Sequence, residues 1–543
     1  MAQLSAPSYD HWYGYDELVA WLRQAADAFP GLCALRSIGK TPEGRDIWLA
    51  EVTDTATGSA EDRPVFFVHA NIHAKELAGT TASLQLIHDL LSGEGGGIDV
   101  HALLRDVVFA IIPRLNPDGA EFALTTGGEI RSRLEEQRIP NGLYQHDVDG
   151  DGAIVSMRIE RPDGDMKISE ADARLMVPRD PTDTDGPFYR VYPEGLIHEY
   201  DGGDFTYRTR SHDFNRNWPA NWRQEHEQGG AGDYPFSEPE MRALADYVYS
   251  HPGIFGVLGF HCGTNAILTP PSVGAETDVT PQDRDVFRRL NERAAELTGF
   301  DPRATIDYRH DSQPPIALQG HSADWGYQHM GLFHYEIELG NIYNAAGVSG
   351  KDFFAAEPWE RYEFERDAIR YHDEHPDYGI FVDWHDFEHP QLGTVQIGGW
   401  RRFWLINPSL EQLRERIAPG SSRFIIEYAA RRPRLAVTDT TVKAVAGEVY
   451  RVRAHILNAG AFATNITQRA LALRSLKPVV VELLPAEGVE VLSRSRHHEI
   501  AQLPAHGRSH ELEWFVRGPS GSQVTIRASA PKSCPGETVV TLP

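Results

Sequence analysis

Residues 65–76, Val-Phe-Phe-Val-His-Ala-Asn-Ile-His-Ala-Lys-Glu, place an apolar run just before a histidine and a glutamate three residues apart. The unbroken apolar run at 65–68 predicts a strand that is buried on both faces. Zinc binds neutral imidazole nitrogen and carboxylate oxygen, and a catalytic zinc site takes three protein ligands. His73 and Glu76 therefore form two thirds of such a site. Read alone, the same spacing is also expected by chance in a solvated loop.

A second unbroken apolar run lies at 107–112, and helical periodicity is found at 18–29 and 80–91. Apolar strands separated by amphipathic helices indicate a sheet that helices cover on both faces. We therefore predict an α/β fold with a mixed, mostly parallel sheet flanked by helices.

From about residue 435 the pattern changes to short alternating segments, such as 450–456 and 512–516, separated by turn residues. Short strands of this kind are typical of a β-sandwich of immunoglobulin-like size. The chain is also longer than one hydrophobic core usually supports. We therefore predict a catalytic domain at 1–432 and an immunoglobulin-like β-sandwich domain at 433–543.

The formal net charge of −26 argues against nucleic-acid partners and against anionic membrane surfaces. No apolar run is long enough for a transmembrane helix, and the first residues lack the pattern of a secretory signal. We therefore expect a cytoplasmic protein, with an exported or mature form as the open alternative. The oligomeric state is open. The three cysteines are far apart and contain no C-x-x-C pair, which argues against a disulfide framework and a cysteine-based zinc site.

Four further motifs carry groups suited to chemistry. Asn-Pro-Asp-Gly at 116–119 follows the apolar run 107–112, at the strand end where α/β sheets gather ligands; a simple turn is the alternative. Asn215 and Arg216 offer an amide beside a guanidinium, which suits a carboxylate. His261 ends the apolar run that begins at residue 254, and alone it would be a core histidine.

The fourth motif is a predicted strand at 332–339. Glu336 and Glu338 share one face of it by the period of two. A carboxylate that points into a metal cleft can act as a general base toward water.

Together these residues resemble the zinc metallocarboxypeptidase family, the carboxypeptidase A-like M14 peptidases. The motifs stand in the family's order: His73 and Glu76, 116–119, Asn215 and Arg216, His261, Ser-x-Asp-Trp at 322–325, and Glu338. The resemblance covers roughly residues 8 to 345 and leaves out the sandwich.

The resemblance implies that His73, Glu76 and His261 bind one zinc ion. It implies that Glu338 is the base that deprotonates the attacking water.

The resemblance also implies residues that bind the substrate. Asn215 and Arg216 would hold the terminal carboxylate of a peptide. Arg131 stands where the family places the arginine that polarises the scissile carbonyl, with Arg133 as a close competitor.

Three departures from the family pattern bear on activity. An insertion is predicted at about 127–212, where it could form a lid or rim over the cleft. The family's mobile tyrosine is replaced by Ile316. Ala323, at a position that helps set side-chain preference, is uncharged, which gives no indication of a preference for basic residues.

Inside the insertion, Asp147, Asp149 and Asp151 match the first half of a calcium loop. The twelfth position is Arg158 where the calcium motif has a bidentate glutamate. A calcium ion and a solvated Asp-Gly turn are therefore both open.

We expect a zinc-dependent metallocarboxypeptidase that hydrolyses the C-terminal peptide bond of peptides or proteins with zinc-activated water. A first alternative is a zinc-dependent amide hydrolase for a non-peptide or cell-wall substrate, which the missing tyrosine and the insertion favour. A second alternative is a non-catalytic binding module that retains the fold.

Overall fold

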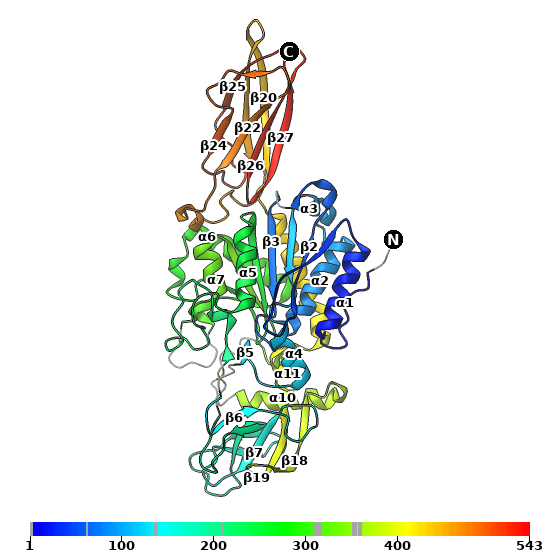
Figure 1. Cartoon of the computed structure of the whole chain (residues 1–543), viewed down its shortest axis with the longest axis vertical. Helices are drawn as coiled ribbons and strands as arrows, with labels where there is room; N and C mark the ends of the chain where they lie inside the picture. The colour runs from blue at the N-terminus through cyan, green and yellow to red at the C-terminus, as the bar shows by residue number, and fades with distance from the viewer. Residues whose placement is uncertain are drawn as a thin grey trace.

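An eight-stranded mixed sheet forms the centre of the computed structural model (Figure 1). The structure describes residues 4–60, 63–134, 138–207, 211–308, 317–349, 356 and 361–543. The strand order is β1-β2-β4-β3-β14-β17-β15-β16. The bounds are β1 Cys33–Lys40, β2 Asp46–Val52, β3 Val65–Ala70, β4 Val108–Ile112, β14 Ile254–His261, β15 Asn265–Thr269, β16 Asp301–Ala304 and β17 Phe333–Leu339.

The four central strands, β4, β3, β14 and β17, are parallel. All residues of these strands are buried, as the unbroken apolar runs in β3, β4 and β14 predict. The pairs β1–β2, β2–β4 and β15–β17 are antiparallel. The predicted α/β fold with a mixed, mostly parallel sheet is therefore confirmed.

Helices flank this sheet. Helices α2 and α6 both pack against α13, and α1 and α5 pack against β1. The main helices are α1 Tyr15–Ala28, α2 Ala78–Ser92, α3 Val100–Asp106, α4 Pro117–Thr126, α5 Pro239–Ser250, α6 Pro281–Thr298, α10 Arg361–Glu374, α11 Arg402–Ile406 and α13 Ala418–Ala430. No helix among the described residues is long and apolar enough to cross a membrane.

The predicted insertion forms most of a separate β-module, seen below the α/β layer in Figure 1. Its six-stranded sheet has the order β18-β19-β7-β10-β8-β9. These strands are β7 Ser156–Glu160, β8 Met166–Ile168, β9 Met176–Pro178, β10 Tyr189–Pro193, β18 Phe381–His389 and β19 Gly393–Trp400. Two of them therefore come from far beyond the insertion, and a small core that includes Met157, Ile197 and Ile397 joins the two segments.

Shorter strands complete the insertion. A three-stranded sheet contains β11 Gly195–His198, β6 Gly142–Gln145 and β12 Thr206–Tyr207, and a two-stranded ribbon joins β5 Arg133–Leu134 to β13 Ser211–His212. The ribbon lies between the module and the α/β layer in Figure 1.

The C-terminal residues form two four-stranded sheets, β20-β21-β25-β23 and β24-β22-β26-β27, which confirms the predicted β-sandwich. The strands are β20 Leu435–Ala446, β21 Val449–Asn458, β22 Val479–Pro485, β23 Glu490–Val491, β24 His497–Ile500, β25 Leu512–Arg517, β26 Gln523–Ala530 and β27 Ser533–Thr541. Buried and partly buried residues alternate along β21, and a core around Trp514 lies between the sheets.

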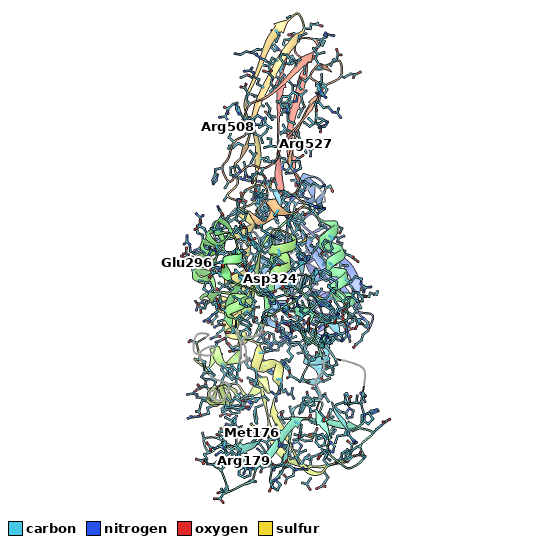
Figure 2. All side chains as sticks on the ribbon, turned by 90° about the vertical axis from the view of Figure 1, so that its left-hand side faces the viewer. Met176, Arg179, Glu296, Asp324, Arg508 and Arg527 are labelled. Atoms are coloured by element: carbon cyan, nitrogen blue, oxygen red, sulfur yellow. The ribbon has the colours of Figure 1, made fainter. Side chains whose placement is uncertain are left out.

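The three parts follow one another along the long axis of the molecule. Figure 2 shows Met176 in the β-module, Asp324 in the α/β layer and Arg527 in the sandwich. The sandwich contacts the α/β layer through Asp283, whose carboxylate accepts hydrogen bonds from the backbone N–H groups of Gln468 and Arg469. The predicted boundary at 432/433 falls between α13 and β20.

Candidate metal centre

His73, Glu76, His261 and Glu338 meet at the carboxyl-terminal edge of the central strands. His261 is the last residue of β14, and it lies directly opposite Glu338 of β17 in the parallel register. His73 and Glu76 lie in the loop that follows β3, the other neighbour of β14. Parallel neighbours end at the same edge, which is why residues so distant in sequence come together.

The turn after β3 is shaped by Asn71, which has a positive φ of 56°. Its side-chain amide donates hydrogen bonds to the carbonyls of His73 and Ala74, at 2.8 and 3.2 Å. Asparagine tolerates this left-handed conformation better than most residues. The turn thereby directs His73 and Glu76 toward the end of β14.

Three donor side chains converge within the distances expected around one ion. Nδ1 of His73 lies 2.8 Å from Oε1 of Glu76, and Nδ1 of His261 lies 3.1 Å from Oε2 of the same carboxylate. The two Nδ1 atoms are 3.2 Å apart. All three side chains are buried. Burial alone would raise the pKa of Glu76. His73 and His261 nevertheless hold this pKa below its ordinary value.

The donor set fits zinc on chemical grounds. Two imidazole nitrogens and one carboxylate oxygen are a known ligand set of catalytic zinc sites. Such a site requires no thiolate ligand. The backbone N–H of Cys262 donates to Oε2 of Glu76 at 3.1 Å and fixes the carboxylate. Among the described residues, Oε2 of Glu338 is buried and has no hydrogen-bond partner, as expected for an oxygen reserved for another group.

These residues line a pocket of about 300 Å³. Its lining also includes Arg131, Asp213, Asn215, Arg216, Tyr308, His321, Glu336 and the apolar residues Leu268, Leu318 and Ile406. The structure thus brings every predicted ligand, the predicted base and the predicted substrate-binding residues to one pocket.

Arg131 and Arg133 have different surroundings. Nη1 of Arg131 donates to Oε1 of Glu76 at 3.0 Å, so its guanidinium lies in the pocket. The guanidinium of Arg133 instead pairs with Glu238 and Glu240. This geometry favours Arg131 over Arg133 for contact with a substrate.

The Asn-Pro-Asp-Gly turn holds Arg131 in place. The side chain of Asn116 caps α4 by accepting from the Gly119 N–H, and it donates to the carbonyl of Ser132 at 2.7 Å. The N–H of Ala74, in the ligand loop, donates to the carbonyl of Arg131 at 2.7 Å. The turn therefore ties the Arg131 segment to the ligand loop.

Asn215 and Arg216 do not present their polar groups in the same way. The amide nitrogen of Asn215 faces Glu336 at 3.3 Å, and its oxygen accepts from the Ser322 N–H at 3.0 Å. The guanidinium of Arg216 donates to the Asn215 carbonyl at 2.7 Å and lines the pocket beside Arg131. The polar atoms of the Asn215 side chain are thus occupied by protein groups, whereas Arg216 remains directed at the pocket.

Burial, and next the charge of Glu76, raise the pKa of Glu338 to about 8. A cation beside these carboxylates would lower it again, because opposite charge favours the ionised form. The ionisation of Glu338, and with it the ability of Glu338 to act as a base, therefore depends on the charge at the ligand cluster.

Three polar residues of the pocket were not predicted. Asp213 and His321 lie within two residues of predicted motifs, and that proximity is the only signal they give in sequence. Tyr308 follows the edge strand β16, and burial together with the charge of Glu338 raises its pKa well above the ordinary value. Its phenol thus stays protonated as a hydrogen-bond donor. Ile316, the predicted replacement of the family tyrosine, lies outside the described residues.

The predicted calcium loop brings the carboxylates of Asp147, Asp149 and Asp151 within 4.8 Å of one another. Asp147 accepts hydrogen bonds from the N–H groups of Gly150 and Gly152 in the same loop. This is the bonding of an Asp-Gly turn, and the calcium interpretation receives no support.

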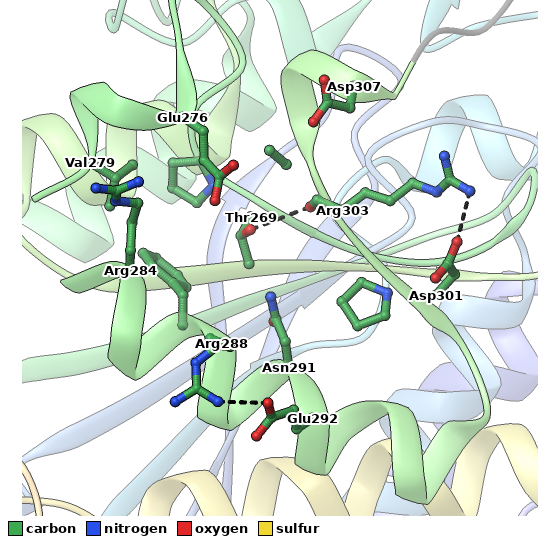
Figure 3. Close-up of a pocket in the computed structure, with 14 residues that line it drawn as sticks. Thr269, Glu276, Val279, Arg284, Arg288, Asn291, Glu292, Asp301, Arg303 and Asp307 are labelled. Carbon is green, nitrogen blue, oxygen red and sulfur yellow. Dashed lines mark hydrogen bonds and ion pairs between the residues drawn. The ribbon is translucent and has the colours of Figure 1, made fainter. Parts of the chain in front are cut away.

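A separate cavity of about 490 Å³ lies among α6, β15 and β16 (Figure 3). Its arginines include Arg288, which pairs with Glu292, and Arg303, which pairs with Asp301 (Figure 3). The cavity contains none of the predicted site residues.

Known proteins resemble this chain in two regions. The zinc carboxypeptidase family, Peptidase M14, matches residues 18–357. A domain family of unknown function matches residues 434–541.

The similar proteins are mostly carboxypeptidases by name. A zinc carboxypeptidase of Saccharothrix mutabilis subsp. capreolus is 31% identical over 133 residues, 24% of this chain and 30% of that protein. The inactive metallocarboxypeptidase ECM14 of Ajellomyces capsulatus is 29% identical over 134 residues, 25% of this chain and 22% of that protein. The crystal structure of carboxypeptidase A from Helicoverpa armigera has a TM-score of 0.41 and 18% identity, over 68% of this chain and 75% of that one.

The matched regions span less than a third of either curated relative. The family match, in contrast, covers more than half of the chain and contains His73, Glu76, His261 and Glu338. The resemblance inferred from the order of the motifs is thereby confirmed, and the chain belongs to the zinc carboxypeptidase family, M14.

Proposed function

We propose that this protein is a zinc-dependent carboxypeptidase that hydrolyses the C-terminal peptide bond of peptides or proteins. The observation that carries the proposal is the convergence of Nδ1 of His73, the Glu76 carboxylate and Nδ1 of His261 beside the unpaired Oε2 of Glu338. Family membership supports the zinc chemistry. Because one relative is named inactive, membership alone does not establish activity, and the proposal depends on the presence of all four groups.

His73, Glu76 and His261 would hold the zinc ion. When bound, zinc supplies Lewis-acid polarisation of a carbonyl and activation of water. Glu338 accepts a proton from the attacking water and can return it to the leaving amine.

Two arginines would bind the substrate. Arg131 lies beside Glu76 and can donate to the scissile carbonyl as negative charge develops on its oxygen. Arg216 lines the same pocket and can bind the terminal carboxylate with its planar guanidinium. The apolar lining by Leu268, Leu318 and Ile406 would suit an apolar C-terminal side chain.

A zinc-dependent hydrolase of non-peptide amides is a second candidate. The bonding of the Asn215 amide to Glu336 and Ser322 favours it, because the carboxylate clamp then relies on Arg216 without a neighbouring amide.

The test combines zinc analysis with hydrolysis of blocked dipeptides that end in apolar, basic or acidic residues. The proteins are the parent, Glu338→Gln and the surface control Glu296→Gln, whose side chain is exposed on α6. The proposal expects bound zinc and release of the C-terminal amino acid by the parent and the control, with turnover lost in Glu338→Gln. Zinc without peptide turnover would favour the second candidate, and a parent that binds no zinc contradicts both.

A further inference from the structure

Glu336 is a second buried carboxylate beside the ligand cluster, to which the proposed function assigns no role. It lies two residues before Glu338 on the same face of β17, and only 1% of its surface is exposed. Burying a carboxylate is costly unless hydrogen-bond donors and positive charges surround it. Its partners therefore indicate what it does.

The nearest ligand to Glu336 is His261. Nδ1 of this histidine faces Glu76, whereas Nε2 faces Oε1 of Glu336 at 3.5 Å. Among the described residues, this buried Nε2 atom makes no hydrogen bond of normal geometry, and its contact with Glu336 is a longer ion-pair contact. An imidazole that offers Nδ1 to a metal carries its proton on Nε2, and Glu336 is the carboxylate that this N–H faces.

Glu336 is itself held from two other directions. Nε2 of His321 lies 3.0 Å from Oε2, and the amide nitrogen of Asn215 lies 3.3 Å from Oε1. Nδ1 of His321 accepts from the N–H of Ala323 at 3.4 Å, which leaves the proton on Nε2, directed at Glu336. The carboxylate thus faces three donors from three segments of the chain.

This arrangement also accounts for the orientation of Asn215. Its amide oxygen accepts from the Ser322 N–H, and its amide nitrogen is directed at Glu336. The bond to Ser322 therefore anchors the amide, the amide nitrogen contacts the Glu336 carboxylate, and the carboxylate in turn faces the ligand His261.

We propose that Glu336, held by His321 and Asn215, is a positioning residue that fixes the tautomer and ring orientation of His261 and strengthens zinc binding by this histidine. The proposal rests on the proposed function, because it requires that His261 is a zinc ligand. Carboxylates that accept from the free N–H of a metal-bound imidazole raise its basicity, and losing one costs about 10- to 100-fold in metal affinity.

A different role would give Glu336 direct contact with the substrate, since it also lines the pocket. A buried carboxylate there would select a basic side chain. The two roles differ in what they affect without substrate: a positioning residue changes zinc binding, and a substrate contact does not.

The experiment measures zinc affinity of the full chain by competition with a chelator, without substrate. The variants are Glu336→Gln, which keeps the shape and removes the charge, Glu336→Asp, which keeps the charge, and His321→Ala. Asp324→Asn is the matched control, because Asp324 is a buried carboxylate that accepts from the Ser272 N–H and the Asn221 amide and does not face the ligands.

We expect Glu336→Gln to weaken zinc binding by about 10- to 100-fold, with partial recovery in Glu336→Asp and unchanged affinity in Asp324→Asn. The visible spectrum of the cobalt-substituted protein should shift in Glu336→Gln and not in the control. His321→Ala should weaken zinc binding in the same direction, and it decides the question if Glu336→Gln does not fold.

The proposal is overturned if folded Glu336→Gln binds zinc within about twofold of the parent's affinity. If Glu336→Gln does not fold, the same result in folded His321→Ala overturns it. An altered KM for basic substrates with that unchanged affinity would assign Glu336 to the substrate instead. A parent that binds zinc and hydrolyses peptides leaves the proposed function standing in either case. A parent that binds no zinc removes both.

Discussion

Nε2 of His73 lies 3.0 Å from Oδ1 of Asp213, although 140 positions separate the two residues in the chain. The other oxygen of Asp213 accepts from Nε of Arg131 at 3.0 Å. Burial alone would raise the pKa of Asp213, yet Arg131 and Arg216 hold it well below its ordinary value. One carboxylate therefore orients both a candidate ligand and a candidate substrate-binding arginine.

Asp213→Asn should weaken zinc binding by roughly 10- to 100-fold, because His73 loses an anionic partner for its second nitrogen. Chelator competition measures the effect, and Asp233→Asn, at an exposed position, serves as the control. Equal zinc affinity in Asp213→Asn and the control would show that this contact does not support the ligand.

Arg131→Ala and Arg133→Ala should fail in different ways. Removing Arg131 should lower kcat by about 10²- to 10³-fold, since a donor to the developing oxyanion is lost. Removing Arg133 leaves Glu240 buried without its partner and should cost about 3–5 kcal/mol of unfolding free energy.

Steady-state kinetics and thermal unfolding separate these two outcomes. A large loss of kcat in folded Arg133→Ala, with Arg131→Ala active, would reverse the assignment.

Without added zinc, the stability of the protein should depend on Glu338. Its pKa is raised from 4.5 to about 8, so its protonated form contributes stability that is complete below pH 4.5 and is lost as the pH rises through about 8. Glu338→Gln removes this dependence. The variant should therefore gain roughly 4 kcal/mol over the parent between pH 5 and 8.5.

Denaturant unfolding with a chelator present measures this difference across pH. Saturating zinc should abolish it, because the cation favours the ionised carboxylate. A constant difference between variant and parent at all pH values would contradict the assigned pKa.

Tyr308→Phe should reduce kcat/KM by about 2- to 10-fold and leave zinc affinity unchanged, as expected when one hydrogen-bond donor to the substrate is removed. The phenol lines the same pocket as Glu338 and is kept protonated by burial. Hydrolysis of a blocked dipeptide by the two proteins gives the comparison. Unchanged kcat/KM would place Tyr308 outside the substrate contacts.

Much of the fold and the metal cluster could be predicted because each ligand stands at the end of a strand that its sequence marks as buried. His261 ends one such strand, and His73 and Glu76 follow its neighbour. Parallel strand order then brings them together.

What could not be predicted depends on contacts between distant segments. Arg131 and Arg133 differ only by the partners that they meet, and Glu238 and Glu240 lie more than 100 residues away. The pairing of β19 with β7 in the β-module joins segments separated by more than 200 residues. Nothing in the sequence of either strand indicates that the two strands pair. Tyr308 likewise reaches the pocket only through the turn after β16.

The most direct test of the central claim is the zinc content of the purified chain after dialysis against zinc-free buffer at neutral pH. The account predicts one zinc per chain in the parent, and almost none in His73→Ala or His261→Ala, since each removes one of three ligands. A folded parent without zinc, or a full complement of zinc in both histidine variants, would contradict it.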